Sequence, residues 1–206
     1  MRTLLLWLGL GAGAALAVAC DDADSVDCEC AEVGCFAPMC TRLAFVLAEP
    51  VSPKFGGVSA ADQMCAQQAQ AAGLPGTYYA WLGHSGGGPA DRFSRASVPY
   101  TLPDGTLLAA DWDALTREGP DAAIDMTAAG KRVEAEDDAR VWTGTNEAGD
   151  ANTYNNASNY CSDWTRNVIG EFAVVGFLRD RSKIGAWALG NLVPCTGKGY
   201  VYCFQQ

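Results

Sequence analysis

The cysteines are the residues of this 206-residue sequence whose type and spacing most clearly imply chemistry. There are nine, in three groups along the chain: Cys20 alone, then Cys28, Cys30, Cys35 and Cys40, then Cys65, Cys161, Cys195 and Cys203. One single cysteine and two sets of four fit an exported protein with one modified thiol and two even sets of disulfides. Spacing alone leaves three connectivities open in each set of four.

The first set of four lies in CECAEVGCFAPMC, residues 28–40, which is too dense in cysteine for a helix or a strand. A zinc knuckle has a similar density of thiols. However, C-x-C-x4-C-x4-C lacks the paired C-x2-C spacing of common structural zinc sites, and an exported setting favours disulfides. We expect two local disulfides here, without choosing their pairing.

Hydrolytic chemistry has little support in the other side chains. The one histidine, His84, lies in the glycine-rich run GHSGGGPADR. A lone loop histidine is far more often solvated than a general base, and no G-x-S-x-G, H-E-x-x-H or P-loop sequence accompanies it. We expect no catalytic residue.

The beginning of the chain, MRTLLLWLGLGAGAALAVAC, resembles a bacterial lipoprotein signal, with one arginine, an uncharged apolar run and small residues just before Cys20. The usual leucine stands one place early, at Leu16, so plain signal-peptidase cleavage nearby is the alternative. A transmembrane anchor fits less well, because the apolar run is at the short limit for spanning a bilayer. We predict an exported protein that is lipid-anchored in the bacterial cell envelope, at the outer membrane or the cell surface. Its expected parts are a signal peptide (1–19), an acylated Cys-rich tether (20–40) and one domain (41–206).

The charge of the chain limits its partners. The formal net charge is −10, and losing Arg2 with the signal would make the mature chain more acidic. An acidic surface repels phosphates, so nucleic acid, heparin-like polyanions and anionic lipid headgroups are poor partner candidates. We expect contact with the membrane through the lipid anchor only.

The elements that position the second set of cysteines follow from the pattern of the body. Residues 43–47 predict a buried strand, and Ser59 is the expected N-cap of a helix that ends at Gly73. On that helix one narrow face at helical spacing holds Ala61, Cys65, Ala69 and Ala72. Cys65 is therefore expected to point into the core.

The rest of the body predicts short strands joined by loops. Trp81, Trp112 and Trp142 lie within strand or turn patterns, so we expect them in the core. We expect strands in 77–82, 141–145, 171–180 and 199–204, and two more on either side of an Asp104-Gly105 turn within 98–115, followed by a helical turn near Asp111. We expect surface loops at 84–92, at 117–140, which has at most one short strand, and at 146–160.

The order of these pieces resembles the endostatin-like domain, which ends certain vertebrate collagens and also occurs in exported bacterial proteins of unassigned role. The resemblance covers about residues 42–206. It rests on GGVSAADQMCAQQAQAAGLPGTYYAWL, DR at 91–92, VPYTLPDGTLLAADWDAL, VWTGT, CSDW and a terminal C-x7-C. One departure is Ala60 where the family has glycine before Ala-Asp.

This resemblance implies an α+β, C-type lectin-like fold with a mixed, mainly antiparallel sheet, one main helix and long loops. It also implies two nested disulfides, Cys65–Cys203 and Cys161–Cys195. Independently of the family, Cys65 is expected on the buried face of its helix, and Cys203 alternates with Val201 along the last strand. Cys161 and Cys195 are both expected in loops.

The ligand sites known in that family do not transfer. The histidines and arginine clusters that serve zinc and heparin in the vertebrate domain have no counterparts here, and of the calcium loop of sugar-binding lectins at most Asn191 remains. We therefore expect no cofactor, with calcium as the one remaining option. We expect a ligand-contact surface that comprises His84, Tyr154, Asn155, Asn156 and Tyr160.

The function expected from the sequence is a non-catalytic binding module at the cell surface that recognises a polysaccharide or a surface protein. One alternative is an enzyme of the formylglycine-generating type, which has the same fold and needs reactive thiols. The other is a purely structural envelope protein. The oligomeric state is open.

Overall fold

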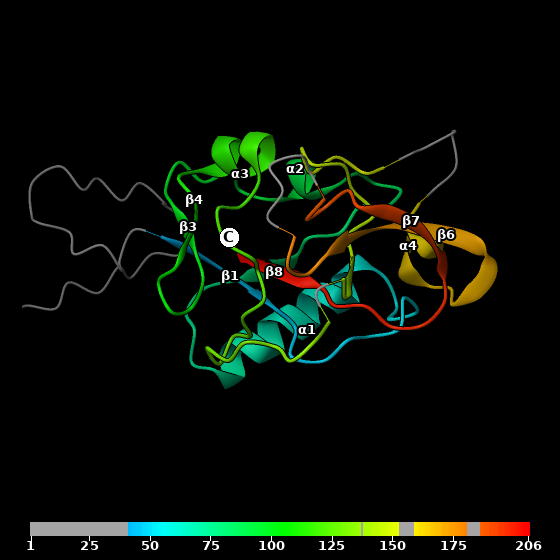
Figure 1. Ribbon diagram of the computed structural model, residues 1–206, viewed down its shortest axis with the longest axis horizontal. Coiled ribbons are helices and arrows are strands. Elements are labelled where there is room, and N and C mark those ends of the chain that lie inside the picture. Colours follow the sequence, from blue (N-terminus) through cyan, green and yellow to red (C-terminus); the bar gives the residue numbers. More distant parts are fainter. Residues whose placement is uncertain (1–40, 137, 153–158, 181–185) are drawn as a thin grey trace, which may run out of the picture.

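Two β-sheets organise the part of the chain that the computed structural model describes, residues 41–136, 138–152, 159–180 and 186–206 (Figure 1). The larger is mixed, because β1 pairs with β3 in parallel and its other pairs are antiparallel. Its strand order is β2 (Tyr78–Ala80), β8 (Tyr202–Gln205), β1 (Arg42–Val46), β3 (Tyr100–Thr101) and β4 (Leu107–Ala109). The smaller sheet is antiparallel, in the order β5 (Arg140–Trp142), β6 (Val168–Phe177) and β7 (Asn191–Cys195). The protein is therefore α+β.

The helices cover both faces of the larger sheet. They are α1 (Val58–Ala71), α2 (Pro89–Arg92), α3 (Trp112–Glu118) and α4 (Cys161–Trp164). In Figure 1, α1 lies below the larger sheet, while α2 and α3 lie above it. The described residues contain no helix long and apolar enough to cross a membrane.

The one long helix, α1, begins earlier than expected and ends where expected. Its N-cap is Gly57, at φ 96°, and not Ser59, so that expectation was wrong. At its end Gly73 (φ 70°) adopts a left-handed conformation, and the N–H of Leu74 donates to the carbonyl of Ala69 at 2.9 Å. This is the hydrogen-bond pattern of a Schellman motif, for which glycine is favoured because it has no Cβ.

Strand alternation divides the core into two clusters, one on each face of the larger sheet. Along β8, Tyr202 and Phe204 enter the cluster on the α2–α3 side, while Cys203 enters the cluster beneath α1. The first cluster contains Trp81 and Trp112, exposed by 0% and 5%, and the second contains Trp142, exposed by 0%. All three tryptophans expected in the core are therefore buried, each with a hydrophobic contribution of roughly 2–3 kcal/mol.

Both disulfides have the pairing implied by the resemblance. Cys65, on the buried face of α1, bonds Cys203 of β8. Cys161 bonds Cys195 within the stretch of chain that the Cys65–Cys203 bond closes. The placement of the inner pair in loops was wrong, since Cys161 begins α4 and Cys195 ends β7. The outer bond joins the main helix to β8, an interior strand of the larger sheet, and the inner bond joins α4 to the smaller sheet.

The segment 117–140 is more than a surface loop. Ile124, Met126 and Val133 are buried in the core. Asp125, exposed by 5%, forms ion pairs with Arg132 and Arg179. Part of the charge of this segment therefore forms ion pairs that fix the segment to the domain. The overall composition of residues 117–140 did not indicate this.

Candidate functional site

The two loops expected to form a contact surface lie against each other. Gly83 donates its N–H to the carbonyl of Thr143 at 2.7 Å, and Ala90 donates to the carbonyl of Gly149 at 3.0 Å. A Cβ on Gly88 would lie 2.1 Å from the Gly149 oxygen, so glycine is required there by close contact. The described parts of loops 84–92 and 146–160 therefore form one packed unit.

The individual residues expected on that surface have different outcomes. His84 is partly exposed, and its Nδ1 accepts a hydrogen bond from the N–H of Gly86 at 2.9 Å. Tyr160 is exposed by only 6% and packs in the cluster beneath α1, so its expected role on the surface was wrong. The other three, Tyr154, Asn155 and Asn156, lie outside the described residues.

Next to these loops, α4 is a left-handed turn. Its four residues have φ values of 52°, 49°, 55° and 61°, and none of them is glycine. Each such residue costs roughly 1–2 kcal/mol relative to a right-handed conformation, because its Cβ approaches the following carbonyl oxygen. Surrounding contacts must therefore hold this turn in place.

Those contacts connect α4 to the glycine-rich loop. The carboxylate of Asp163 accepts hydrogen bonds from the N–H and the hydroxyl of Ser85, both at 2.7 Å. The indole N–H of Trp164, which is fully buried, donates to the carbonyl of Gly83 at 2.8 Å. Together with the Cys161–Cys195 bond, these contacts hold the loops, α4 and the smaller sheet in one arrangement.

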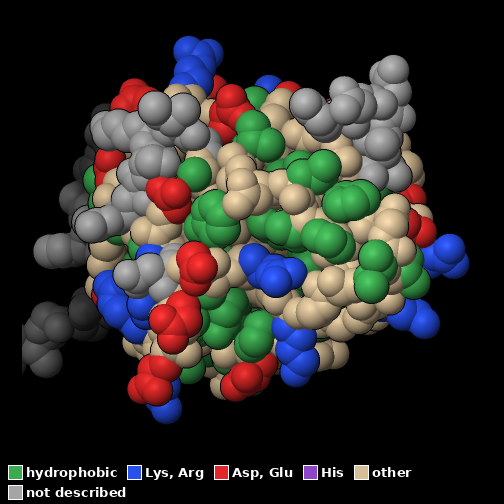
Figure 2. Space-filling view, turned by 45° about the vertical axis from the view of Figure 1, so that its right-hand side comes forward, with side chains coloured by type: hydrophobic (Ala, Val, Ile, Leu, Met, Phe, Trp, Pro, Cys, Tyr) green, Lys and Arg blue, Asp and Glu red, His purple; other side chains and the backbone are tan. Residues whose placement is uncertain are grey.

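Four of the five exposed large hydrophobic side chains of the described residues lie on β6 and β7. We call Val168, Ile169, Phe172 and Leu192, exposed by 39, 88, 42 and 45%, the hairpin patch. The pairs Phe172↔Pro194 and Val174↔Leu192 place Phe172 and Leu192 on one face of this strand pair, while Ala173 and Val175 face the core. The register shifts between Val168, which pairs with Cys195, and Phe172, and Ile169, in this irregular stretch, is the most exposed of the four side chains. Figure 2 brings this end of the molecule toward the viewer and shows hydrophobic side chains gathered on its face, with Lys or Arg side chains both among and around them and Asp and Glu side chains to the left and below.

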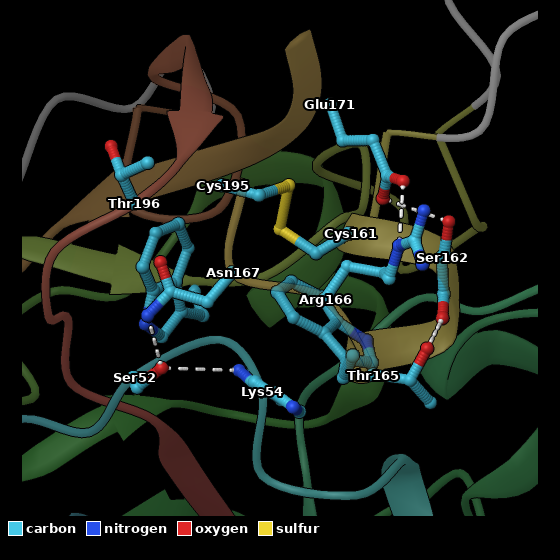
Figure 3. Close-up of a disulfide and its surroundings, with 12 residues drawn as sticks. Ser52, Lys54, Cys161, Ser162, Thr165, Arg166, Asn167, Glu171, Cys195 and Thr196 are labelled. Atoms are coloured by element: carbon cyan, nitrogen blue, oxygen red, sulfur yellow. Dashed lines mark hydrogen bonds and ion pairs between the residues drawn. A yellow bond between two sulfur atoms is a disulfide. The ribbon is translucent and has the colours of Figure 1, made fainter. Parts of the chain in front are cut away.

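Polar contacts fix the base of the hairpin patch (Figure 3). Glu171 accepts from the hydroxyl of Ser162 at 2.8 Å and pairs with Arg166 at 3.1 Å. These two partners, Ser162 first, hold the pKa of the Glu171 carboxyl below its usual value. The side-chain amide of Asn167 donates to the hydroxyl of Ser52 at 2.7 Å, which ties the start of β6 to the segment after β1.

A groove of about 540 Å³ lies between α1 and the edge of β2, but its charged groups are already engaged. Asp62 accepts the N–H of Ala80 at 2.8 Å, and Arg92 donates to the carbonyl of Ala80 at 3.2 Å. Asp62 and Arg92 are also joined at 2.6 Å, and the guanidinium lies 5.5 Å from the Tyr79 ring. This ion pair takes the place of a neighbouring strand at the sheet edge.

A second groove, of about 560 Å³, lies beside the first described residue, Thr41, and the β3–β4 turn. Leu107, exposed by 46%, is its most prominent apolar side chain. It lies away from the loops, α4 and the hairpin patch, so it serves as a comparison surface for experiments on them.

Sequence reasoning missed the hairpin patch for an identifiable reason. We expected a strand in 171–180, whereas β6 runs from Val168 to Phe177 and pairs with a strand, β7, that was not expected at all. The sequence feature that could have indicated the patch is the apolar residues within NVIGEF (167–172) and NLVP (191–194). Side chains of this kind are usually buried, but here several of them are exposed.

The described residues contain no group of three or more His, Cys, Asp or Glu side chains that could together hold a metal ion. No protein-family model matches this sequence, and no curated protein matches it. What the site does must therefore be inferred from its own geometry.

Proposed function

We propose that this chain is an exported, lipid-anchored protein of the bacterial cell envelope whose body is an endostatin-like domain with a C-type lectin-like fold, and that it binds a protein partner through the hairpin patch. The anchor is Cys20, and residues 1–40 are the signal peptide and tether. The two nested disulfides support the family assignment, because they have the pairing that the resemblance implies.

The observation that carries the binding role is the exposure of the hairpin patch. A single exposed apolar side chain is ordinary, but a group of them on one rigid surface is typical of an interaction site. The bond from Cys195, which pairs with Val168, fixes the patch to α4. Little conformational entropy is then lost when a partner binds.

A protein partner fits the patch better than a glycan does. Sugar rings stack on the flat faces of exposed aromatic side chains. All the tryptophans among the described residues are buried: Trp81, Trp112, Trp142, Trp164 and Trp187. The patch offers three aliphatic side chains and Phe172, which suit the apolar side chains of another protein.

The position of the patch also supports recognition of a partner away from the anchor. In Figure 1, β1 begins near the left end of the molecule, and β6 and β7 lie at the right end. A tether that ends at residue 40 therefore joins the domain far from the hairpin patch.

A binding role is also supported by the state of the thiols. All four cysteines of residues 41–206 are in disulfides, whereas a formylglycine-type enzyme needs thiols that are free to react. A purely structural envelope protein would bury the patch in a fixed assembly and would bind no separate ligand.

The experiment is selection of binders from a phage-displayed random peptide library against the full chain in detergent. We expect enriched peptides whose binding falls at least tenfold for Ile169→Ser/Phe172→Ser, since central apolar contacts dominate such interfaces. Leu107→Ser is the matched control, because Leu107 has comparable exposure on the other groove. Circular dichroism and disulfide mapping establish that both variants are folded.

Two outcomes would overturn the proposal. One is a selection that yields no binders, or binders that both variants retain equally. The other is binding on a glycan array that the hairpin double variant leaves unchanged, which would favour a polysaccharide ligand at residues outside the patch.

A further inference from the structure

Cations border the hairpin patch, although the chain as a whole is acidic, with a net charge of −10. Val51 and Gly199 exchange two backbone hydrogen bonds, at 2.8 and 3.0 Å, which brings Lys198 beside the segment that contains Lys54. That segment is tied to the residue before Val168 by the Asn167–Ser52 hydrogen bond. Lys54 and Lys198 therefore lie next to the start of β6.

Two arginines add to this group. Arg166 follows α4 and is 59% exposed. Arg140 donates to the carbonyl of Thr196 at 3.1 Å, and its guanidinium lies 5.7 Å from the Trp142 ring. The four cations come from four separate segments: Arg166 lies two residues before Val168, and Arg140 bonds the residue that follows Cys195, the strand partner of Val168.

The carboxylates nearby neutralise only part of this charge. Glu171 is engaged by Arg166 and Ser162, and Asp163 is engaged by Ser85. Glu49 lies two residues before Val51, and its charge adds to burial in raising the pKa of Tyr200. Lys54 and Lys198 are exposed and form no ion pair with another described residue.

On the basis of the proposed function, we infer that the partner presents an acidic segment, in which apolar side chains cover the hairpin patch and neighbouring Asp or Glu carboxylates pair with Lys54 and Lys198. Opposite charges at the rim of an interface steer association and select the partner, while the apolar contacts supply most of the affinity.

Other occupants fit these charges less well. A second copy of the chain would bring the same cations to both sides of a two-fold interface, without additional carboxylates to pair with them. An anionic lipid surface would attract the lysines, but it would repel the acidic remainder of the molecule. An acidic segment of limited length meets only the local positive charge.

The test uses the peptides recovered in the library selection, labelled and titrated by fluorescence anisotropy. We expect them to carry Asp or Glu beside apolar residues. We expect Lys54→Glu/Lys198→Glu to weaken their binding about tenfold and added NaCl to weaken it further, as for exposed ion pairs. Lys54→Gln/Lys198→Gln should give an intermediate loss. Lys131→Glu, a reversal at an exposed lysine in the 127–132 turn, should give none.

Failure of the inference differs from failure of the proposed function. The inference of an acidic partner would be overturned by neutral or basic peptides whose binding is unchanged in Lys54→Glu/Lys198→Glu but disappears in Ile169→Ser/Phe172→Ser. That result would leave the binding role of the hairpin patch intact. Recovery of no peptides would overturn both. Two further results would overturn the inference in favour of another occupant: lysine-dependent binding to phosphatidylglycerol vesicles without peptide binding, or patch-dependent dimerisation in sedimentation.

Discussion

Replacing Ser162 by glycine and, separately, by alanine tests whether α4 is held in a left-handed conformation. Ser162 has φ 49° and ψ 61° and is exposed, so neither change creates a cavity. Its hydroxyl bonds Glu171, and both variants lose that contact equally. The difference in unfolding free energy between the two variants therefore isolates the effect of the Cβ.

The expected difference follows from two opposing terms. A Cβ in the left-handed region costs roughly 1–2 kcal/mol. Glycine costs roughly 0.5–1 kcal/mol in the folding equilibrium, because its unfolded chain has more freedom. Ser162→Gly should therefore be more stable than Ser162→Ala by about 0.8 kcal/mol, the difference between the midpoints of the two ranges.

The sign should reverse at a control position in a right-handed helix. Ala66 is exposed within α1, and Ala66→Gly should lower the free energy of unfolding by about 1 kcal/mol. Urea unfolding under non-reducing conditions, followed by tryptophan fluorescence, measures all three variants. If Ser162→Ala proves as stable as Ser162→Gly or more stable, α4 does not carry the strain we attribute to it.

Two further predictions concern the core. Replacing Cys65 and Cys203 by alanine should lower the free energy of unfolding by about 5 kcal/mol, and replacing Cys161 and Cys195 should lower it by about 4 kcal/mol, because the entropy that a disulfide removes from the unfolded chain grows with the length of the closed loop, here 138 and 34 residues. Urea unfolding midpoints check this order. A larger loss from removing the inner bond would contradict it. Burial raises the pKa of Tyr78 to about 12, and its hydroxyl is buried without a partner among the described residues. The free energy of unfolding should therefore fall as the pH rises from 10 to 12, and Tyr78→Phe should reduce that fall and raise stability at pH 7 by about 1 kcal/mol. An unchanged slope of stability against pH in Tyr78→Phe would refute this reasoning.

The sequence could predict the elements whose side chains have a clear period. Strand β1 was expected because residues 43–47 form a continuous apolar run, and helix α1 because small and apolar residues recur every three to four positions. The same helical spacing correctly placed Cys65 on the buried face. The pairing of the four body cysteines came from the resemblance, since spacing alone left three possibilities.

The parts that could not be predicted depend on contacts between distant segments. CSDW contains no glycine or asparagine, so nothing local indicated a left-handed turn, which exists because Ser85, Gly83 and Cys195 hold it from outside. Tyr160 was expected at the surface because its neighbours are polar, but it precedes α4 and is carried into the core with it. Strand β7 is short and contains Pro194, which made it look like a loop.

Two of the edge strands, β2 in the larger sheet and β7 in the smaller, are closed in different ways, and this difference bears on how a partner can bind. At β2, the Asp62–Arg92 pair occupies the backbone groups of Ala80. At β7, Pro194 has no N–H to offer, and the N–H of Thr196 already donates to its carbonyl at 2.7 Å. A partner therefore gains little by adding a strand to β7. It must contact the side chains of the hairpin patch, which is why Ile169 and Phe172, and not backbone groups, are the positions whose substitution should remove binding.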